Sequence, residues 1–149
     1  MENLFTTSAT EKIIDRIGKL TENSKPLWGK MNVGQMLAHC QVPLQVGIGE
    51  AKLKRTLIGI LFGSIAKRAL LKEKPFSKNL PTDKSFIVAD SRLVEAEKAN
   101  LINLINRFTA TDSGAFEQAN HPFFGKMTAD EWGILSWKHL DHHLLQFGV

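Results

Sequence analysis

The chain has 149 residues, of which 43% are hydrophobic and 23% are charged. These ordinary globular proportions exclude a chain that is disordered over its whole length, and the length predicts one domain, residues 1–149, with a buried core. A single cysteine, Cys40, excludes an intramolecular disulfide bond. Residues 1–12 lack the basic start and apolar run of a secretory signal, so we expect a cytoplasmic protein.

Basic residues cluster in the middle of the chain. The net charge is +4, and nine of the 19 lysines and arginines lie in the segment 52–84, where only Glu73 and Asp83 oppose them. The aromatic residues of this segment are Phe62 and Phe76 alone, the chain has no tyrosine, and no nucleic-acid-binding motif accompanies the charge. A solvated face is therefore the expected role of this cluster, and a nucleic-acid partner is not expected.

Helix-start signals divide the first part of the chain. Ser8 and Glu11 have the spacing of a capping box and predict a first helix of about fifteen residues. Its apolar stripe contains Ile13, Ile14, Ile17 and Leu20. Asn32 and Gln35 form a weaker capping box, which predicts a second helix that continues to about Gly47.

The middle of the chain is less regular. Pro43 should kink the second helix or end its regular part, because proline lacks a backbone donor. Thr56–Ala66 is almost wholly apolar but too short to cross a bilayer, so it predicts a buried helix or an interface helix. Within it, Gly59 and Gly63 would let another backbone approach closely. Glu73–Ala89 has two prolines and no sustained periodicity, which predicts a long loop.

A further helix and a further loop follow. Asp90 or Ser91 is expected to cap a helix that reaches about Arg107. Its apolar stripe contains Leu93, Leu101, Leu104, Ile105 and Phe108. Residues 109–127 are expected to form a loop that leads to the final helix.

The final helix has the clearest start signal. Thr128 and Glu131 form a capping box that opens directly onto the apolar segment Trp132–Phe147. Strand-like alternation is scarce along the whole chain. The patterns together predict an all-α fold in which the helices form a bundle.

Two histidines lie one turn apart in the final helix. His139 and His143 are four residues apart, so both side chains lie on one face and their nitrogens can reach one metal ion. A buried face with two imidazoles must satisfy four ring nitrogens, and metal coordination satisfies half of them. Residues near this face are candidates for supporting the ligands or lining a pocket, namely His142, Gln146 and Trp132.

A third histidine, His39, lies beside the apolar stripe of the predicted second helix. A neighbouring helix of a bundle can present one inward side chain at the height of the pair, and three histidines from two helices suit an open metal site. The alternative is that each histidine is a hydrogen-bonded core or boundary residue, because pairs at this spacing also arise by chance.

Several nearby residues limit the chemistry. His139 and His142, three residues apart, form a possible alternative pair. Leu140 occupies the position of the general-base glutamate of an HExxH metalloprotease, which excludes that class. Asp141 should point away from the histidine face, and His121, far upstream, is expected to be a loop or capping histidine.

These segments resemble a known superfamily. The run Gly34–His39, together with the HxxxH motif of the final helix, resembles the DinB-like superfamily of metal-binding four-helix bundles. The strings His121–Gly125, Glu131–Trp132, His139–His143 and Gln146–Gly148 resemble more narrowly a bacterial DinB-like family of unknown function. The resemblance covers nearly the whole chain.

The resemblance implies a fold, a cofactor and partners. It implies a four-helix bundle with one additional short helical segment and long connecting loops. It also implies that His39, His139 and His143 bind a divalent ion, zinc or nickel, and that the protein is a homodimer. Some superfamily members are transferases that use small-molecule thiols such as mycothiol or bacillithiol, so the implied function is a metal-dependent thiol S-transferase or hydrolase.

A non-enzymatic function is the alternative hypothesis. In that case the chain is a helical binding or stress protein with a structural or vestigial metal site, and the basic cluster binds a partner. Closed coordination, with His142 or a carboxylate from the loop Glu73–Ala89 as fourth ligand, would favour it. Cys40, beside His39, is more typical of a core residue than of a nucleophile.

Overall fold

The computed structural model of the chain describes residues 1–70, 72, 74–80 and 84–149. The helices in this part of the chain are α1 (Thr7–Gly18), α2 (Val33–Gly47), α3 (Leu57–Leu70), α4 (Val94–Ala110), α5 (Ser113–Gln118) and α6 (Ala129–Gln146). The other described elements are a 3-10 turn, η1 (Lys84–Phe86), and a short antiparallel hairpin of β1 (Asn120–His121) and β2 (Gly125–Lys126). The predicted all-α class is confirmed.

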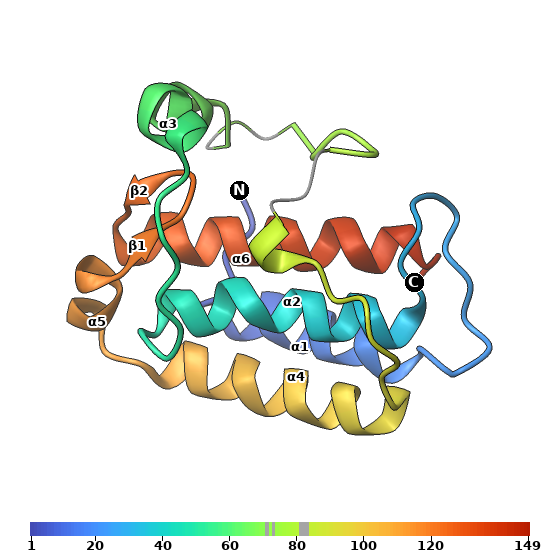
Figure 1. The fold of residues 1–149 in the computed structure, drawn as a ribbon. Helices are drawn as coiled ribbons and strands as arrows, with labels where there is room; N and C mark the ends of the chain where they lie inside the picture. The colour runs from blue at the N-terminus through green and yellow to red at the C-terminus, as the bar shows by residue number, and fades with distance from the viewer. Residues whose placement is uncertain (71, 73, 81–83) are drawn as a thin grey trace.

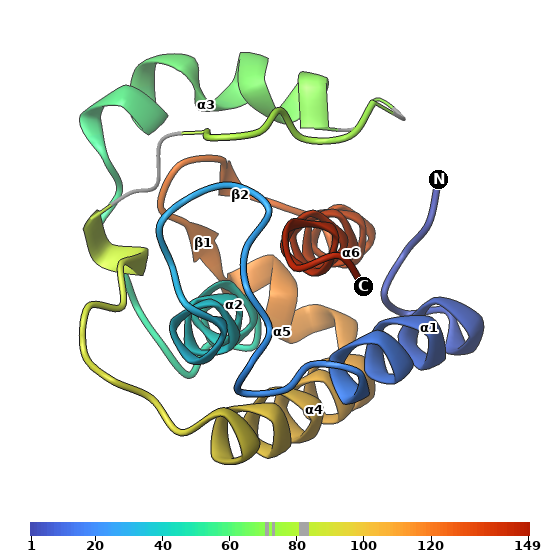
Figure 2. The same cartoon turned by 90° about the vertical axis from the view of Figure 1, so that its right-hand side faces the viewer.

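Four helices form a bundle. α2 packs against α4 and α6, and α1 packs against the same two helices, so the four close into a ring (Figures 1 and 2). α3 and α5 lie outside the ring. The core is filled by apolar side chains from all four bundle helices and from α5, among them Ile13, Ile17, Leu37, Leu101, Phe108, Phe116 and Trp132.

Two of the predicted capping boxes are present. The Asn32 side chain accepts a hydrogen bond from the Gln35 amide at 2.9 Å, and the Gln35 side chain accepts one from the Asn32 amide at 3.1 Å. Thr128 and Glu131 make the same reciprocal pair at the start of α6. These bonds satisfy amide donors that a helix start leaves without partners.

The capping box predicted at Ser8 is wrong. α1 begins at Thr7, and its N-cap, Thr6, makes no side-chain cap. The chain enters the helix through backbone contacts instead, because the Thr6 amide donates to the Asn3 carbonyl and the Thr10 hydroxyl donates to the Leu4 carbonyl. Tertiary contact of the first residues with α6, where the Leu4 amide bonds the carbonyl of Gly133, sets this entry.

The caps predicted for the fourth bundle segment are also wrong. α4 begins at Val94 without a side-chain cap and continues past Arg107 to Ala110. The Asp90 carboxylate is used elsewhere, because it forms an ion pair with Arg92 at 3.2 Å. Leu93 precedes the helix and is 76% exposed, so it does not belong to the predicted apolar stripe.

α2 continues through Pro43 to Gly47. Proline inside a helix removes one hydrogen bond and costs about 3 kcal/mol. Eleven of the 15 residues of α2 are buried, Pro43 among them, so packing against both neighbouring helices offsets that cost. The segment predicted as a loop over 109–127 likewise has structure of its own, since it contains α5 and the hairpin.

α3 rests on the hairpin through its glycines. A methyl group at Gly59 would lie 2.6 Å from the Phe123 carbonyl oxygen, and one at Gly63 would also meet that oxygen. The predicted close backbone approach is therefore confirmed. The Lys67 ammonium strengthens this contact, because it donates to the Lys126 carbonyl at 3.1 Å and pairs with the Glu131 carboxylate at 3.0 Å.

Of the two alternatives predicted for α3, the buried helix is wrong, because its apolar face is exposed to solvent, and the interface helix stays a prediction. A wholly apolar segment carries no polar positions that would show which side faces the protein. None of the described helices has the length and apolar character needed to cross a membrane.

We expect Gly63→Ala to release α3 from the hairpin, because the added methyl group collides with the Phe123 carbonyl. Limited proteolysis with trypsin should then cleave the lysine-rich segment 52–78 several-fold faster than in the wild type. Gly18→Ala is the control, because a methyl group there meets nothing within 4 Å. Equal cleavage rates for both variants would contradict this description of α3.

Candidate metal centre

Three histidines from two helices meet between α2 and α6. α6 presents His139 and His143 one turn apart, with ring centroids 4.7 Å from each other. His39 of α2 faces both, at 4.9 Å and 4.8 Å between ring centroids. One ligand atom from each residue can be chosen so that all lie within 4.8 Å of one another.

The contact between α2 and α6 is close where small residues permit it. Gly47 of α2 leaves room for the Trp132 ring, since a methyl group on Gly47 would lie 3.1 Å from that ring and 3.0 Å from Phe108. The two capped helix starts fix where each helix begins. The close approach of α2 and α6 brings the histidines of the two helices within contact distance.

A backbone carbonyl orients His39. Its Nδ1 lies 2.8 Å from the carbonyl oxygen of Phe86 in η1. A carbonyl only accepts, so Nδ1 carries the proton and, in the neutral ring, Nε2 presents a lone pair. That Nε2 points toward the other helix and lies 3.0 Å from Nε2 of His139.

A glutamine orients His143 in the same way. Gln146 Nε2 donates to the Trp28 carbonyl at 2.6 Å, which turns its Oε1 toward His143 Nδ1 at 2.8 Å. His143 Nδ1 is therefore a donor, and Nε2 of the neutral ring presents a lone pair. Gly29 permits this arrangement, because its φ is +80° and a methyl group on it would collide with the Gln146 amide.

Burial keeps the three rings neutral. It lowers the pKa of His39 below its ordinary 6.5, although the hydrogen bond to Phe86 opposes the shift. It also lowers the pKa of His143, to about 3, with His39 adding to the effect and the bond to Gln146 opposing it. The pKa of His139 is held well below 6.5 by burial and by the neighbouring imidazoles. Neutral imidazole is the form that binds metals.

The distances suit a shared cation. Imidazole nitrogens that bind one zinc ion at about 2.0–2.1 Å lie roughly 3–4 Å from each other. Two lone pairs facing each other at the 3.0 Å between His39 and His139 repel, so a proton or a cation must lie between them. A proton would satisfy this pair alone, whereas a divalent ion would satisfy all three rings.

The exposure of the three rings differs. His39 and His143 are buried, whereas His139 is only partly buried. Among the described residues, no cysteine, carboxylate or further histidine joins this group. Glu73 and Asp83, the acidic residues of the predicted loop that were considered as fourth ligands, lie outside the described residues. The described part of the site thus offers three ligands, of which His139 is the least buried residue.

His142 lies outside the three-histidine group. It is partly buried, its ring lies 5.2 Å from that of His143, and it lines a neighbouring cavity. Burial lowers its pKa, and the Asp141 carboxylate opposes the shift. In the described structure, His139 therefore forms a group with His39 and His143. The alternative pair of His139 and His142 is not the one that the structure brings together.

The other predicted residues divide between the site and the core. Gln146 supports His143, as described above. Trp132 lies about 10 Å along α6 from His139, fully buried and 5.5 Å from the ring of His121. His121 Nδ1 accepts hydrogen bonds from the amides of Phe123 and Phe124, which matches the expected capping role.

Two further residues take no part in the site. Cys40 is buried beside Met36, and burial raises the pKa of its thiol, so it behaves as a core residue. Asp141 faces α1, where its carboxylate pairs with Arg16 at 2.7 Å. Both observations agree with the expectations from the sequence.

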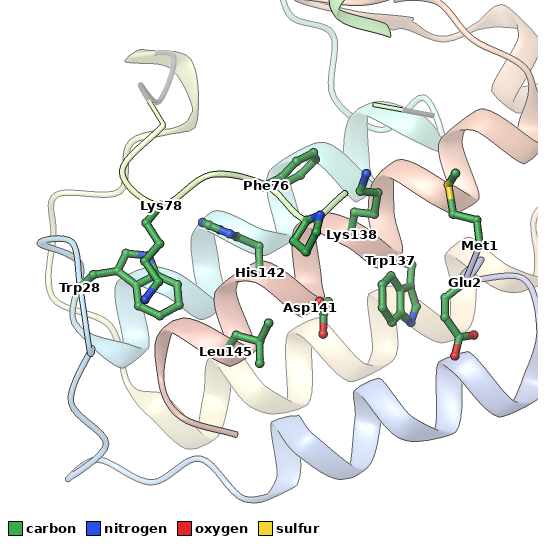
Figure 3. Close-up of a pocket in the computed structure, with 11 residues that line it drawn as sticks. Met1, Glu2, Trp28, Phe76, Lys78, Trp137, Lys138, Asp141, His142 and Leu145 are labelled. Carbon is green, nitrogen blue, oxygen red and sulfur yellow. The ribbon is translucent and has the colours of Figure 1, made fainter. Parts of the chain in front are cut away.

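A cavity of about 370 Å³ lies along α6 beside His142 (Figure 3). Its walls include the rings of Trp28, Phe76 and Trp137. The Lys78 ammonium lies at its edge, 4.4 Å above the Trp28 ring. None of the three clustered histidines lines this cavity, but His142, which does, has its ring 5.2 Å from that of His143.

Some supporting contacts had no signal in the sequence. The carbonyls of Phe86 and Trp28 act through the backbone, and any residue type supplies a carbonyl. Lys138 is a lysine, a residue type that is seldom buried, yet it is 6% exposed and its ammonium donates to the carbonyls of Leu70, Lys72 and Lys74 at 2.8–2.9 Å. It thereby ties the segment after α3 to the residue next to His139.

Comparison with known families gives one match. The model of a family described as "Protein of unknown function (DUF1569)" matches residues 2–148. The chain belongs to the DUF1569 family. No curated protein and no solved structure matches it. Membership of DUF1569 assigns no activity, and the wider DinB-like resemblance stays a prediction.

We expect the metal-free DUF1569 chain to lose stability as the pH falls from about 6.5 toward 3. Histidine titrates near 6.5 in the unfolded chain but near 3 at the folded His143, so the unfolded state binds more protons in this window. The stabilisation by neutral His143 is complete above pH 6.5 and is lost as the pH approaches 3. One such group contributes a slope of up to about 1.4 kcal/mol per pH unit.

Urea unfolding with a chelator at several pH values measures this slope. His143→Asn removes the titrating ring, so the slope of the variant should be smaller than that of the wild type over the same window. Identical slopes for the two proteins would show that His143 is not held neutral by the fold.

Proposed function

We propose that this protein binds one divalent ion through Nε2 of His39, His139 and His143 and acts as a metal-dependent enzyme of DinB-like type. The observation that carries the proposal is the convergence of three ring nitrogens within 4.8 Å. Hydrogen bonds of His39 and His143 to Phe86 and Gln146 turn the lone pairs of Nε2 toward the shared point. A site of three neutral imidazoles with open positions is the arrangement of catalytic zinc.

Zinc or nickel is the ion that we propose. Imidazole ligands suit both ions, whereas magnesium and calcium prefer oxygen ligands. A bound ion of this kind lowers the pKa of a coordinated water or thiol toward neutrality. We propose that water or substrate takes the open coordination position on the side of His139, the least buried of the three residues.

The residues of the chain would hold and position the reactants. Ser136 lies one turn before His139 on the same helix, and its hydroxyl is buried without a hydrogen-bond partner among the described residues. We propose that this hydroxyl bonds the water or the substrate beside His139. In thiol transfer, the thiol sulfur forms a bond to an electrophilic carbon, the leaving group departs with its bonding electrons, and the thiol proton passes to solvent.

The cavity beside His142 supports a small organic substrate. Its aromatic walls suit an apolar group, and Lys78 at the edge suits an anionic one. We propose that the substrate lies here and reaches the centre past His142. A small-molecule thiol that carries a carboxylate fits this description, and so does an ester or amide for hydrolysis.

Elemental analysis of untagged protein, dialysed against zinc or nickel and then against buffer, tests the metal site. The wild type should retain about one ion per chain, whereas His39→Ala, His139→Ala and His143→Ala should retain little, because each variant loses one of three ligands. His142→Ala is the control and should retain the ion. Equal metal contents in all five proteins would refute the site.

An activity assay distinguishes between the proposed enzyme and a protein whose metal is only structural. The metal-loaded wild type should convert an electrophilic substrate with one member of a panel of low-molecular-weight thiols, or hydrolyse an ester, and His139→Ala should not. If the wild type holds the ion but matches His139→Ala against the whole panel, the non-catalytic alternative is correct.

Gln146→Leu should weaken metal affinity without removing a ligand. Loss of the group that orients a ligating histidine costs about 10–100-fold in affinity. Competition with a chromogenic zinc chelator measures the change, and Gln118→Leu, an exposed glutamine at the end of α5, is the matched control. Unchanged affinity in Gln146→Leu would contradict the orienting role of Gln146.

A further inference from the structure

α3 carries a broad apolar surface that the bundle does not cover. Six large apolar side chains of this helix are between 55% and 79% exposed. We call them the α3 apolar face, which consists of Leu57, Ile58, Ile60, Leu61, Phe62 and Ile65. Single exposed apolar residues are ordinary, but a contiguous group of this size marks an interaction surface.

The α3 apolar face points away from the rest of the molecule. Gly59 and Gly63 form the side of the helix that rests on the hairpin. At 100° per residue, the six apolar side chains span an arc of about 200° centred opposite those glycines. A helix that packs on one protein neighbour needs an apolar stripe of only about 100°. The face is thus wider and more convex than a single protein contact requires.

Positive charge flanks the α3 apolar face at both ends. Exposed basic residues precede the helix and follow its middle, namely Lys52, Lys54, Arg55, Arg68, Lys72 and Lys74. Between Lys52 and Lys74 the sequence contains one acidic residue, Glu73. Among the described residues, the side chains of Lys52, Lys54 and Arg68 enter no ion pair. The flanks therefore offer unneutralised cations beside an apolar surface.

These charges distinguish between the possible occupants of the face. A second copy of the chain would place basic flank against basic flank in either a parallel or an antiparallel pairing of two α3 helices, because both ends carry the same sign. An anionic bilayer accepts both features, since phosphate and acidic headgroups neutralise the flanks while the acyl boundary takes the apolar side chains.

We propose that α3 is a peripheral membrane-binding element that lies in the plane of an anionic phospholipid surface. The α3 apolar face enters the boundary between headgroups and acyl chains, and the basic flanks contact the headgroups. The contact of Gly59 and Gly63 with the hairpin holds the helix on the outer side of the molecule, away from the four-helix ring (Figure 2). A helix that binds in this way lies on the membrane surface and does not need to cross the bilayer.

Vesicle sedimentation with the full-length protein tests the proposal. The protein should bind vesicles of phosphatidylcholine and phosphatidylglycerol at least tenfold more tightly than vesicles of phosphatidylcholine alone. Raising the sodium chloride from about 50 to 500 mM should weaken binding, because salt screens the basic flanks. Equal binding to both vesicle types, or binding to neither, would overturn the proposal.

Matched variants separate the apolar and the basic contributions. Leu61→Asp should reduce binding at least tenfold, whereas Leu93→Asp, the same change at a residue with 76% exposure outside α3, should leave it unchanged. Arg68→Glu should weaken binding to the anionic vesicles only.

Light scattering of the protein in solution tests whether a second copy of the chain covers the α3 apolar face instead. If the wild type is a dimer and Leu61→Asp dissociates it, a second copy covers the face and membrane binding is refuted. The metal site is independent, so His139→Ala should bind vesicles as the wild type does.

Discussion

The packing of α2 against α6 is the contact on which the candidate site depends. It places His39 opposite His139 and His143, with imidazole nitrogens of two helices 3.0 Å apart. Rings buried in this way are held neutral, because charging them in the interior costs free energy. In the metal-free site a proton between His39 and His139 satisfies that pair alone, and a shared cation in its place would satisfy all three rings. The burial that keeps the rings neutral thus prepares the site for an ion.

Segments outside the four bundle helices orient the histidines of the site. Phe86 in η1 and Trp28 before α2 each supply one carbonyl, and these two carbonyls fix the orientation of His39 and, through Gln146, of His143. Lys138 binds the segment after α3 to α6 beside the centre. Segments that connect the helices therefore position the ligands, and one of them carries the exposed α3. This arrangement places a surface for a partner and an interior site on one chain without requiring either to change the other.

The sequence predicted the parts of this arrangement that depend on local spacing. Periodicity gave the bundle helices, and the reciprocal hydrogen bonds of Asn32 and Thr128 follow from residues three positions apart. Contacts between distant segments were not predictable, because the carbonyls that orient His39 and Gln146 come from residues whose type carries no signal. Wrong caps at Ser8 and Asp90 have the same cause, since tertiary contacts fixed those helix starts. The sequence left open whether α3 is a buried helix or an interface helix, because an almost wholly apolar segment has the same pattern in both cases.

Anomalous X-ray diffraction from crystals grown with zinc, recorded at the zinc absorption edge, tests the metal centre most directly. We expect one strong peak between α2 and α6, about 2.0–2.1 Å from Nε2 of His39, His139 and His143, with at least one further position taken by water or a small ligand. A fully occupied peak elsewhere on the chain, or three histidines linked only by hydrogen bonds in the presence of zinc, would contradict the proposed metal centre.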